Sequence, residues 1–171
     1  SSRYNIGTAS INESFSPLLG VDVTMHNNLS LGAKYVKSRV LNLSVTAIQL
    51  VETHSKELVF NAGYKIVNLK MLGASNKATK NNKVSNDLNL RASFSFKNMT
   101  SLCRSIDRGT TQATSGNESF NYSLSADYTY SQMLNMSFFF ERKKTIPLIS
   151  SSSYPTTTTD FGVSLKFSLT K

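Results

Sequence analysis

Apolar and polar residues alternate along six segments of this chain, each roughly ten residues long, and the last of them covers residues 160–171. Successive side chains of a β-strand point to opposite faces of its sheet, so each segment would form a strand with one apolar and one polar face. Strands that separate lipid from water have this pattern, and about nine to eleven residues at the usual tilt cross a bilayer core. The alternation therefore predicts an all-β chain in an antiparallel transmembrane β-barrel of the outer-membrane type.

Residues 87–99, 120–130 and 160–171 show the alternation most clearly. The side chains predicted to face lipid are Leu88, Leu90, Phe94, Phe96, Tyr122, Leu124, Tyr128, Val163, Leu165 and Phe167. The side chains predicted to face the water-filled interior are Asn89, Arg91, Ser93, Ser95, Lys97, Asn121, Ser123, Ser125, Asp127, Ser164, Lys166 and Ser168. Further strands of the same kind are predicted at residues 18–25, 29–36, 58–66 and 134–140.

A soluble antiparallel sandwich is the alternative, because its strands also alternate. The turns of a sandwich would recur at intervals of about 8 to 12 residues. Here the predicted connections are unequal, with tight turns at 26–28 and 131–132 and long polar loops at 104–116 and 142–159. Short turns on one side of the membrane and long loops on the other are typical of outer-membrane barrels.

The number of strands bears on the size of the barrel. If the short turns are periplasmic, seven strands start outside and end in the periplasm, and an odd number does not close a bacterial single-chain barrel. Residues 4–11 are a candidate for an eighth strand. The interior of an eight-stranded barrel is just wide enough for side chains to fill, whereas the polar faces here carry mostly Ser, Asn, Gly and Thr. We therefore expect about seven or eight consecutive strands of a larger barrel with a wide lumen.

No run of eighteen apolar residues and no amino-terminal signal peptide is present in the sequence. A barrel protein must first cross the inner membrane, so we expect a processed chain or a piece of a longer one. Residues 1–171 are then the carboxy-terminal segment of a barrel domain, with its closing strand at about 160–169. The single cysteine, Cys103, has no partner for an internal disulfide or a metal site and is predicted to lie in a loop.

The formal net charge of +9 raises the question of nucleic acid as a partner. The basic residues do not form a stripe with interleaved aromatics, so no nucleic-acid partner is predicted. They are expected in loops, at Lys70, Lys77, Lys80, Lys83, Arg142, Lys143 and Lys144, and singly on the polar faces. Contact with anionic lipid headgroups at a membrane rim and simple solvation in a loop both account for them.

The sequence gives little support for catalysis or for a cofactor. His26 and His54, the two histidines, are predicted in a turn and in an outer loop region, and neither has a serine and a carboxylate at a recognisable spacing. The few acidic residues on or near strands, such as Asp22, Asp127 and Glu141, form no pair that the sequence identifies. We therefore predict that the chain is not an enzyme.

The end of the chain resembles the insertion signal that the assembly machinery binds on the last strand of outer-membrane barrels. That signal has a polar residue, a glycine two positions on, and hydrophobic and aromatic residues at alternate positions. Asp160, Gly162, Leu165 and Phe167 match it. The chain departs from the commonest form because residues 168–171 continue past the aromatic residue.

Longer stretches resemble one family, the SprA/Sov proteins, over nearly the whole chain. The similar segments are residues 10–31, 37–45, 86–96 and 156–169, and the connections at 70–84 and 102–117 match least well. These proteins are giant single-chain barrels of the Bacteroidota outer membrane and form the translocon of the type IX secretion system. The resemblance implies that this chain contributes the last seven or eight strands of such a barrel.

The resemblance also implies partners. These are the rest of the barrel chain, a PorV-type barrel and a periplasmic plug protein that close the pore in turn, and folded cargo bearing a carboxy-terminal sorting domain. Outer-membrane lipid, including lipopolysaccharide, and in some members a role in gliding motility are expected as well. Two other functions stay open: a small eight-stranded adhesin or structural barrel, and a porin or TonB-dependent nutrient transporter.

Overall fold

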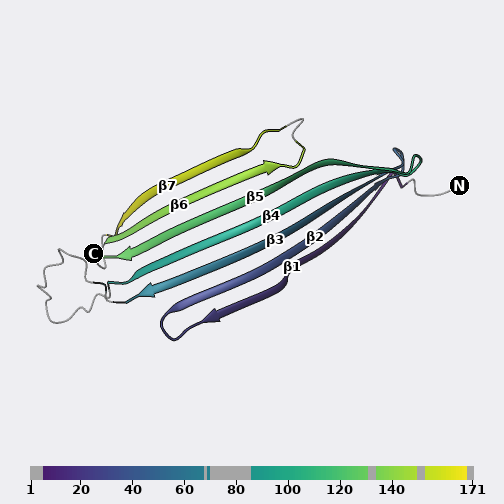
Figure 1. The fold of residues 1–171 in the computed structure, drawn as a ribbon. Helices are drawn as coiled ribbons and strands as arrows, with labels where there is room; N and C mark the ends of the chain where they lie inside the picture. The colour runs from purple at the N-terminus through teal and green to yellow at the C-terminus, as the bar shows by residue number, and fades with distance from the viewer. Residues whose placement is uncertain (1–5, 68, 70–85, 131–133, 150–152, 169–171) are drawn as a thin grey trace, which may run out of the picture.

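The computed structural model describes residues 6–67, 69, 86–130, 134–149 and 153–168, and these form one antiparallel sheet of seven strands (Figure 1). The strands are β1 (Thr8–Thr24), β2 (Leu29–Ser44), β3 (Gln49–Ile66), β4 (Leu88–Ser105), β5 (Thr110–Thr129), β6 (Leu134–Pro147) and β7 (Thr156–Phe167). They lie side by side in chain order, each hydrogen-bonded to the strand before and after it. The prediction of an all-β antiparallel chain is confirmed.

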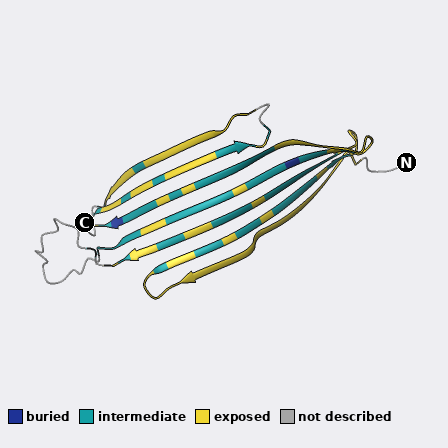
Figure 2. Ribbon diagram, viewed as in Figure 1, coloured by how far each residue is buried: buried dark blue, intermediate teal, exposed yellow. Residues whose placement is uncertain are grey.

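The sheet is a single layer without an interior core. Tyr128 and Ser101 are the buried residues among those described, and most others are half-buried or exposed (Figure 2). No second sheet covers either face within the described residues, as a sandwich requires. The sheet is also open, because β1 and β7 lie at its two edges and do not pair with each other. No helix in the described part of the chain is long and apolar enough to cross a membrane.

Most strands are longer than the alternation predicted. β3, β4 and β5 extend well beyond the predicted segments 58–66, 87–99 and 120–130. The added residues have polar side chains on both faces, so their hydropathy has no period, yet their backbone groups pair along the ladder all the same. Threonine and valine within them also favour extended backbone.

The predicted long loops at 104–116 and 142–159 are therefore wrong in large part. β4 ends at Ser105 and β5 begins at Thr110, so the turn between them spans only 106–109. The connection between β6 and β7 shortens to 148–155. Cys103 lies in β4 and His54 in β3 rather than in loops. Arg142, Lys143 and Lys144 lie in β6. The lysines at 70, 77, 80 and 83 are outside the described residues.

The ends of the sheet do not divide into short turns and long loops as predicted. The turn at 26–28 is confirmed, with Asn28 in the left-handed region at φ 63° and the Leu29 amide donating to Asn27 Oδ1 at 3.3 Å. The longest connection, 67–87, is at this same end, while the opposite end has the turns 45–48 and 106–109. The predicted turn at 131–132 lies outside the described residues.

The predicted eighth strand at 4–11 is wrong as a separate element. Its residues from Thr8 to Ile11 are the beginning of β1 and pair with β2 from Ser44 to Leu41. β1 stays in one sheet because a register shift between Phe15 and Leu19, around Pro17, absorbs extra residues as a bulge. Proline is tolerated there because residues of a bulge lie outside the regular ladder.

Candidate functional site

Most of the apolar side chains of the seven strands lie on one face of the sheet, here called the apolar face. Directly paired residues point to the same face, and the ladder pairs Leu88 with Tyr128, Phe94 with Tyr122 and Phe96 with Phe120. It likewise pairs Val163 with Phe138, Leu165 with Met136 and Phe167 with Leu134. The predicted lipid-facing residues, Leu90 and Leu124 included, therefore share this face.

Aromatic rings follow one another across the central strands of the apolar face. The ring centroids of Phe60 and Phe94 are 6.3 Å apart, and those of Phe94 and Tyr122 are 5.0 Å apart. Phe96 and Phe120 are in contact at 4.9 Å. The face is nevertheless open, since Leu19, Phe161 and Phe167 are each 70% exposed or more. The exposed apolar area spans all seven strands, whereas soluble proteins usually expose only small apolar patches or single apolar residues.

The apolar residues form a band that runs diagonally across the strands, here called the apolar band. In β1 the band covers Leu19, Val21 and Val23, and in β7 it covers Phe161 to Phe167. Paired residues from β1 to β7 place Val21 level with Ala33, Phe60, Phe94, Tyr122, Arg142 and Thr159. In β1 the centre of the band is level with Thr159 of β7, but in β7 itself the centre lies between Val163 and Leu165. The band therefore crosses the strands at an oblique angle.

Basic residues follow the apolar band on the same face, at the end of the sheet that carries turns 45–48 and 106–109. Lys37 comes after Tyr35 in β2, Lys56 borders Leu58 in β3, and Arg142 and Lys144 come after Phe140 in β6. We call these four residues, Lys37, Lys56, Arg142 and Lys144, the basic rim. No described lysine or arginine lies on the apolar face beyond the opposite edge of the band.

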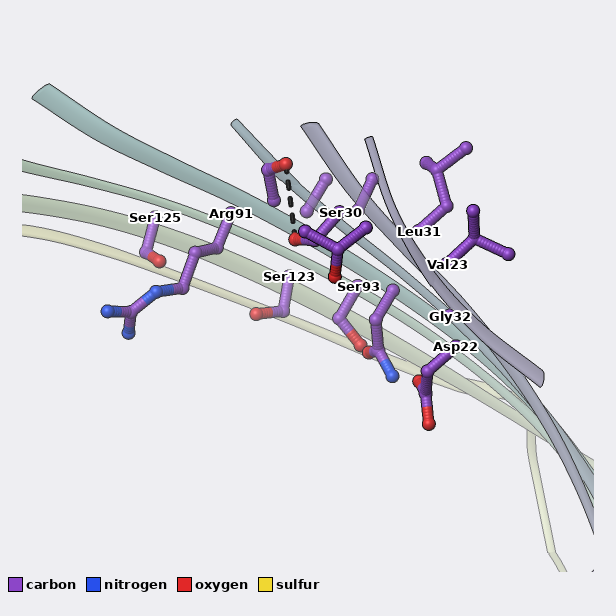
Figure 3. A pocket seen from close by; sticks show the side chains of 14 residues that line it. Asp22, Val23, Ser30, Leu31, Gly32, Arg91, Ser93, Ser123 and Ser125 are labelled. Atoms are coloured by element: carbon purple, nitrogen blue, oxygen red, sulfur yellow. Dashed lines mark hydrogen bonds between the residues drawn. The ribbon is translucent and has the colours of Figure 1, made fainter. Parts of the chain in front are cut away.

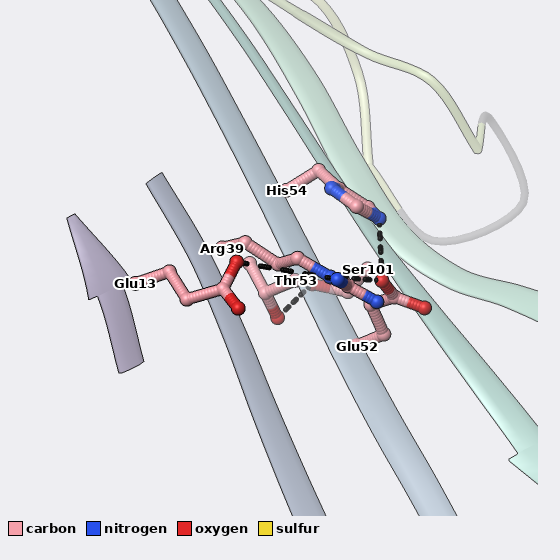
Figure 4. A network of polar contacts seen from close by, with 6 residues as sticks. All are labelled: Glu13, Arg39, Glu52, Thr53, His54 and Ser101. Carbon is pink, nitrogen blue, oxygen red and sulfur yellow. Dashed lines mark hydrogen bonds and ion pairs between the residues drawn. The ribbon is translucent and has the colours of Figure 1, made fainter. Parts of the chain in front are cut away.

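A network of charged side chains lies one step beyond the basic rim (Figure 4). Arg39 Nε donates to Glu52 Oε1 at 2.6 Å, and Glu13 lies 4.0 Å from Arg39 Nη1. His54 Nε2 is 2.9 Å from the same Glu52 oxygen. The sequence did not identify this cluster, because its members come from β1, β2 and β3 and meet only through strand register.

The hydroxyl pair drawn beside the charged cluster lies on the other face of the sheet (Figure 4). Ser101 Oγ lies 2.9 Å from Thr53 Oγ1, and both belong to the opposite face of the sheet from His54. Among the residues that the structure describes, no three His, Cys, Asp or Glu side chains gather closely enough to hold a metal ion. What the cluster does is to join three strands by charge-assisted contacts.

The second face of the sheet, here called the polar face, carries the residues predicted to line the interior. The ladder pairs Asn89 with Asp127, Arg91 with Ser125, Ser93 with Ser123 and Ser95 with Asn121. It also pairs Lys97 with Glu57, Ser164 with Ser137 and Lys166 with Asn135. Ser168 follows the end of β7. Cys103 lies on this face too, opposite Val51 and Gln112.

Small residues hollow the polar face near the turn at 26–28 (Figure 3). Figure 3 shows Asp22, Ser93 and Ser123 on the side of the sheet away from Val23 and Leu31. Gly32 leaves room for Asp22, whose Oδ1 would lie 2.5 Å from an added Cβ. Three basic residues on this face have an acidic neighbour, with Arg91 3.9 Å from Asp127, Lys34 4.0 Å from Asp22, and Lys65 2.9 Å from Asp87.

The residues that match the insertion signal divide between the two faces of β7. Leu165 and Phe167 belong to the apolar face, whereas Asp160 and Gly162 belong to the polar face. Gly162 is paired with Phe139, and a Cβ at Gly162 would lie 2.6 Å from Cε1 of that ring. The phenyl ring therefore covers the glycine backbone, an arrangement that protects glycine in sheets.

The sheet is open and has an apolar face with a diagonal apolar band and a basic rim, and a polar face. No protein-family model matches the chain, and no curated protein sequence matches it.

Proposed function

We propose that this chain forms part of the wall of a wide outer-membrane channel that exports folded proteins by type IX secretion. The observation that carries the proposal is the single-layer sheet itself, with a diagonal apolar band on one face and small polar side chains on the other. A layer with no core of its own needs lipid on its apolar face and water on its polar face.

The height of the apolar band fits a bilayer. In β4 the band runs from Leu88 to Phe96. Nine residues at about 3.3 Å each make roughly 30 Å along the strand. Inclined by about 30°, such a strand covers roughly 26 Å of membrane thickness, which is close to the apolar band of known outer-membrane barrels.

The diagonal course of the band gives that inclination. Its centre moves by about five residues, or roughly 17 Å, over the six spacings between seven strands, which total about 29 Å. The resulting angle is about 30°, near the 35–45° at which barrel strands are inclined to the barrel axis. A two-sheet sandwich does not explain an apolar stripe that crosses its strands at such an angle.

The directions of the edge strands favour additional strands. β1 and β7 run the same way, because seven antiparallel strands follow one another in order. Joining them directly would create a parallel pair in an otherwise antiparallel sheet, so closure needs an odd number of further strands. Two exposed edges of this length would otherwise invite aggregation.

The polar face suits the passage of large cargo. In β4 and β5 the central polar-face positions are serine and asparagine, and Arg91 beside them lies 3.9 Å from Asp127. A hydrated wall of this kind offers few strong binding sites, and its central serine and asparagine side chains are too small to fill a narrow interior. The resemblance to the SprA/Sov proteins supplies the cargo, the PorV-type barrel and the periplasmic plug as proposed partners.

A cross-linking experiment tests both the orientation of the faces and the cargo. A photoreactive amino acid placed at Ser93 is expected to capture exported cargo in cells, because this position faces the proposed lumen. The matched control places the same group at Phe94, one residue away on the other face, where lipid is expected. Cargo captured equally from both positions, or captured from Phe94 alone, would contradict the proposed orientation.

A further inference from the structure

Lys37 and Lys56 face each other directly across β2 and β3, on the apolar face. Both side chains belong to exposed residues. Two like charges at directly opposed positions of an antiparallel pair destabilise the sheet. The positions are also the first beyond Tyr35 and Leu58, which end the apolar band in these strands. The arrangement therefore concentrates positive charge at the edge of an apolar surface.

Nearby side chains do not neutralise this lysine pair within the described part of the chain. Lys37 is flanked by Phe15 and Lys56 by Asn98, whose amide donates to Glu118 Oε1 at 3.0 Å. Glu118 lies in the same row two strands from Lys56 and accepts the Asn98 amide, while Glu13 and Glu52 contact Arg39 and His54. No ion pair joins Lys37 or Lys56 to a described carboxylate, so this lysine pair is left for an external anion.

β6 repeats the arrangement independently. Arg142 and Lys144 follow Phe140 on the same face, opposite Tyr122 and Phe120. No ion pair joins either of them to a described acidic residue. Because the apolar band is inclined, the basic residues of β6 border it just as the lysines of β2 and β3 do. The edge of the band at the other end of the sheet has no such residues in the described chain.

We propose that Lys37 and Lys56 together bind the phosphate of a membrane lipid whose acyl chains lie on Tyr35, Leu58 and Phe96. Each ammonium group has three hydrogen-bond donors for phosphate oxygens. The neighbouring row, Tyr35, Leu58 and Phe96, offers apolar surface for the acyl chains. A phosphate between the lysines removes their mutual repulsion. The proposal rests on the apolar face being in a bilayer, and it places phosphate-bearing lipid in the leaflet next to the basic rim.

Fluorescence quenching tests the site, since the chain has no tryptophan of its own. Tyr35→Trp places a fluorescent reporter beside the lysine pair. The emission of the intact protein without this substitution is subtracted from that of the variant. The protein is reconstituted in phosphatidylcholine vesicles that contain either brominated phosphatidic acid or brominated phosphatidylcholine. We expect brominated phosphatidic acid to be enriched beside the reporter by about fivefold or more for each lysine.

A double variant and a matched control assign the enrichment to the lysines. Lys37→Gln with Lys56→Gln is expected to make the two brominated lipids quench equally. The control variant, Lys34→Gln with Lys97→Gln, removes two positive charges from the polar face instead. It is expected to keep the stronger quenching by brominated phosphatidic acid. Phe96→Trp supplies a second reporter on the same row if Tyr35→Trp fails to fold.

The outcomes separate this proposal from the proposed function. Equal quenching by both lipids with the lysines in place would overturn the phosphate site while leaving the membrane face intact. Quenching by neither lipid would mean that the apolar face is not in the bilayer, and both proposals would fall. Loss of the preference on adding inorganic phosphate at constant ionic strength would show a site for the phosphate group without the lipid, which also overturns the proposal.

Discussion

At the scale of single residues, glycine and its neighbours decide how closely side chains approach the backbone. Gly162 and Gly32 both sit beneath a side chain of an adjacent strand, the Phe139 ring and the Asp22 carboxylate. Neither has a left-handed backbone, so what matters at these positions is space. Gly162 is also one of the four residues that match the insertion signal, and its contact with Phe139 gives the glycine a packing role.

Replacing Gly162 with alanine is expected to destabilise the sheet by about 1 kcal/mol, because the new Cβ forces the Phe139 ring from its position. The free energy of unfolding in urea measures this loss. Gly20→Ala is the matched control, since its Cβ would have contacts of 3.6 Å or more. In a Phe139→Ala background the penalty of Gly162→Ala should disappear, and an undiminished penalty there would refute the packing role.

At the scale of elements, cross-strand pairs explain how polar strand ends stay in register beyond the apolar band. β2 and β3 remain paired as far as Ser44 and Gln49, beyond the apolar band. The Arg39–Glu52 contact crosses these two strands at 2.6 Å, and Thr53 binds Ser101 of β4 on the other face. Such pairs fix the register where hydropathy does not.

A double-mutant cycle with Arg39→Gln and Glu52→Gln is expected to show a coupling free energy of about 0.5–1 kcal/mol that decreases as salt is added. Both side chains are partly exposed, which keeps the value small. The same cycle on Lys34 and Asp22, 4.0 Å apart and more exposed, should give a coupling near zero. Equal coupling in the two pairs would show that the short Arg39 contact adds no stability.

At the scale of the whole molecule, the described strands leave two sheet edges that the proposed function would pair with further strands. Both edges of the sheet carry unpaired backbone groups, and the two edge strands run in the same direction. An odd number of additional antiparallel strands satisfies both conditions at once. Under the proposed function those strands belong to the same giant barrel.

The intact mass of the denatured native polypeptide containing these residues measures the size of that barrel. We expect a chain several times larger than 18.9 kDa, or a cleaved chain that co-purifies with a large amino-terminal partner. Peptide mapping upstream of Ser1 distinguishes these two forms. A single species near 18.9 kDa, without other barrel strands, would contradict the translocon and favour a small self-contained protein.

The sequence alone determined the antiparallel β-structure and the division of residues between two faces. Side chains such as Phe94 and Ser93 lie on opposite faces in any register, because alternation is a property of the extended backbone. The alternation did not reveal the polar ends of β3, β4 and β5, since ladder hydrogen bonds form regardless of side-chain polarity.

The register between strands was decided only by the tertiary structure. Pairing Lys37 with Lys56, placing Phe139 over Gly162 and inclining the apolar band all depend on which residue lies opposite which. A shift by two residues would keep every side chain on its face and still separate these partners. Hydropathy specifies the face of each residue because the period is two, whereas the level along the strand follows from turns, bulges and cross-strand contacts.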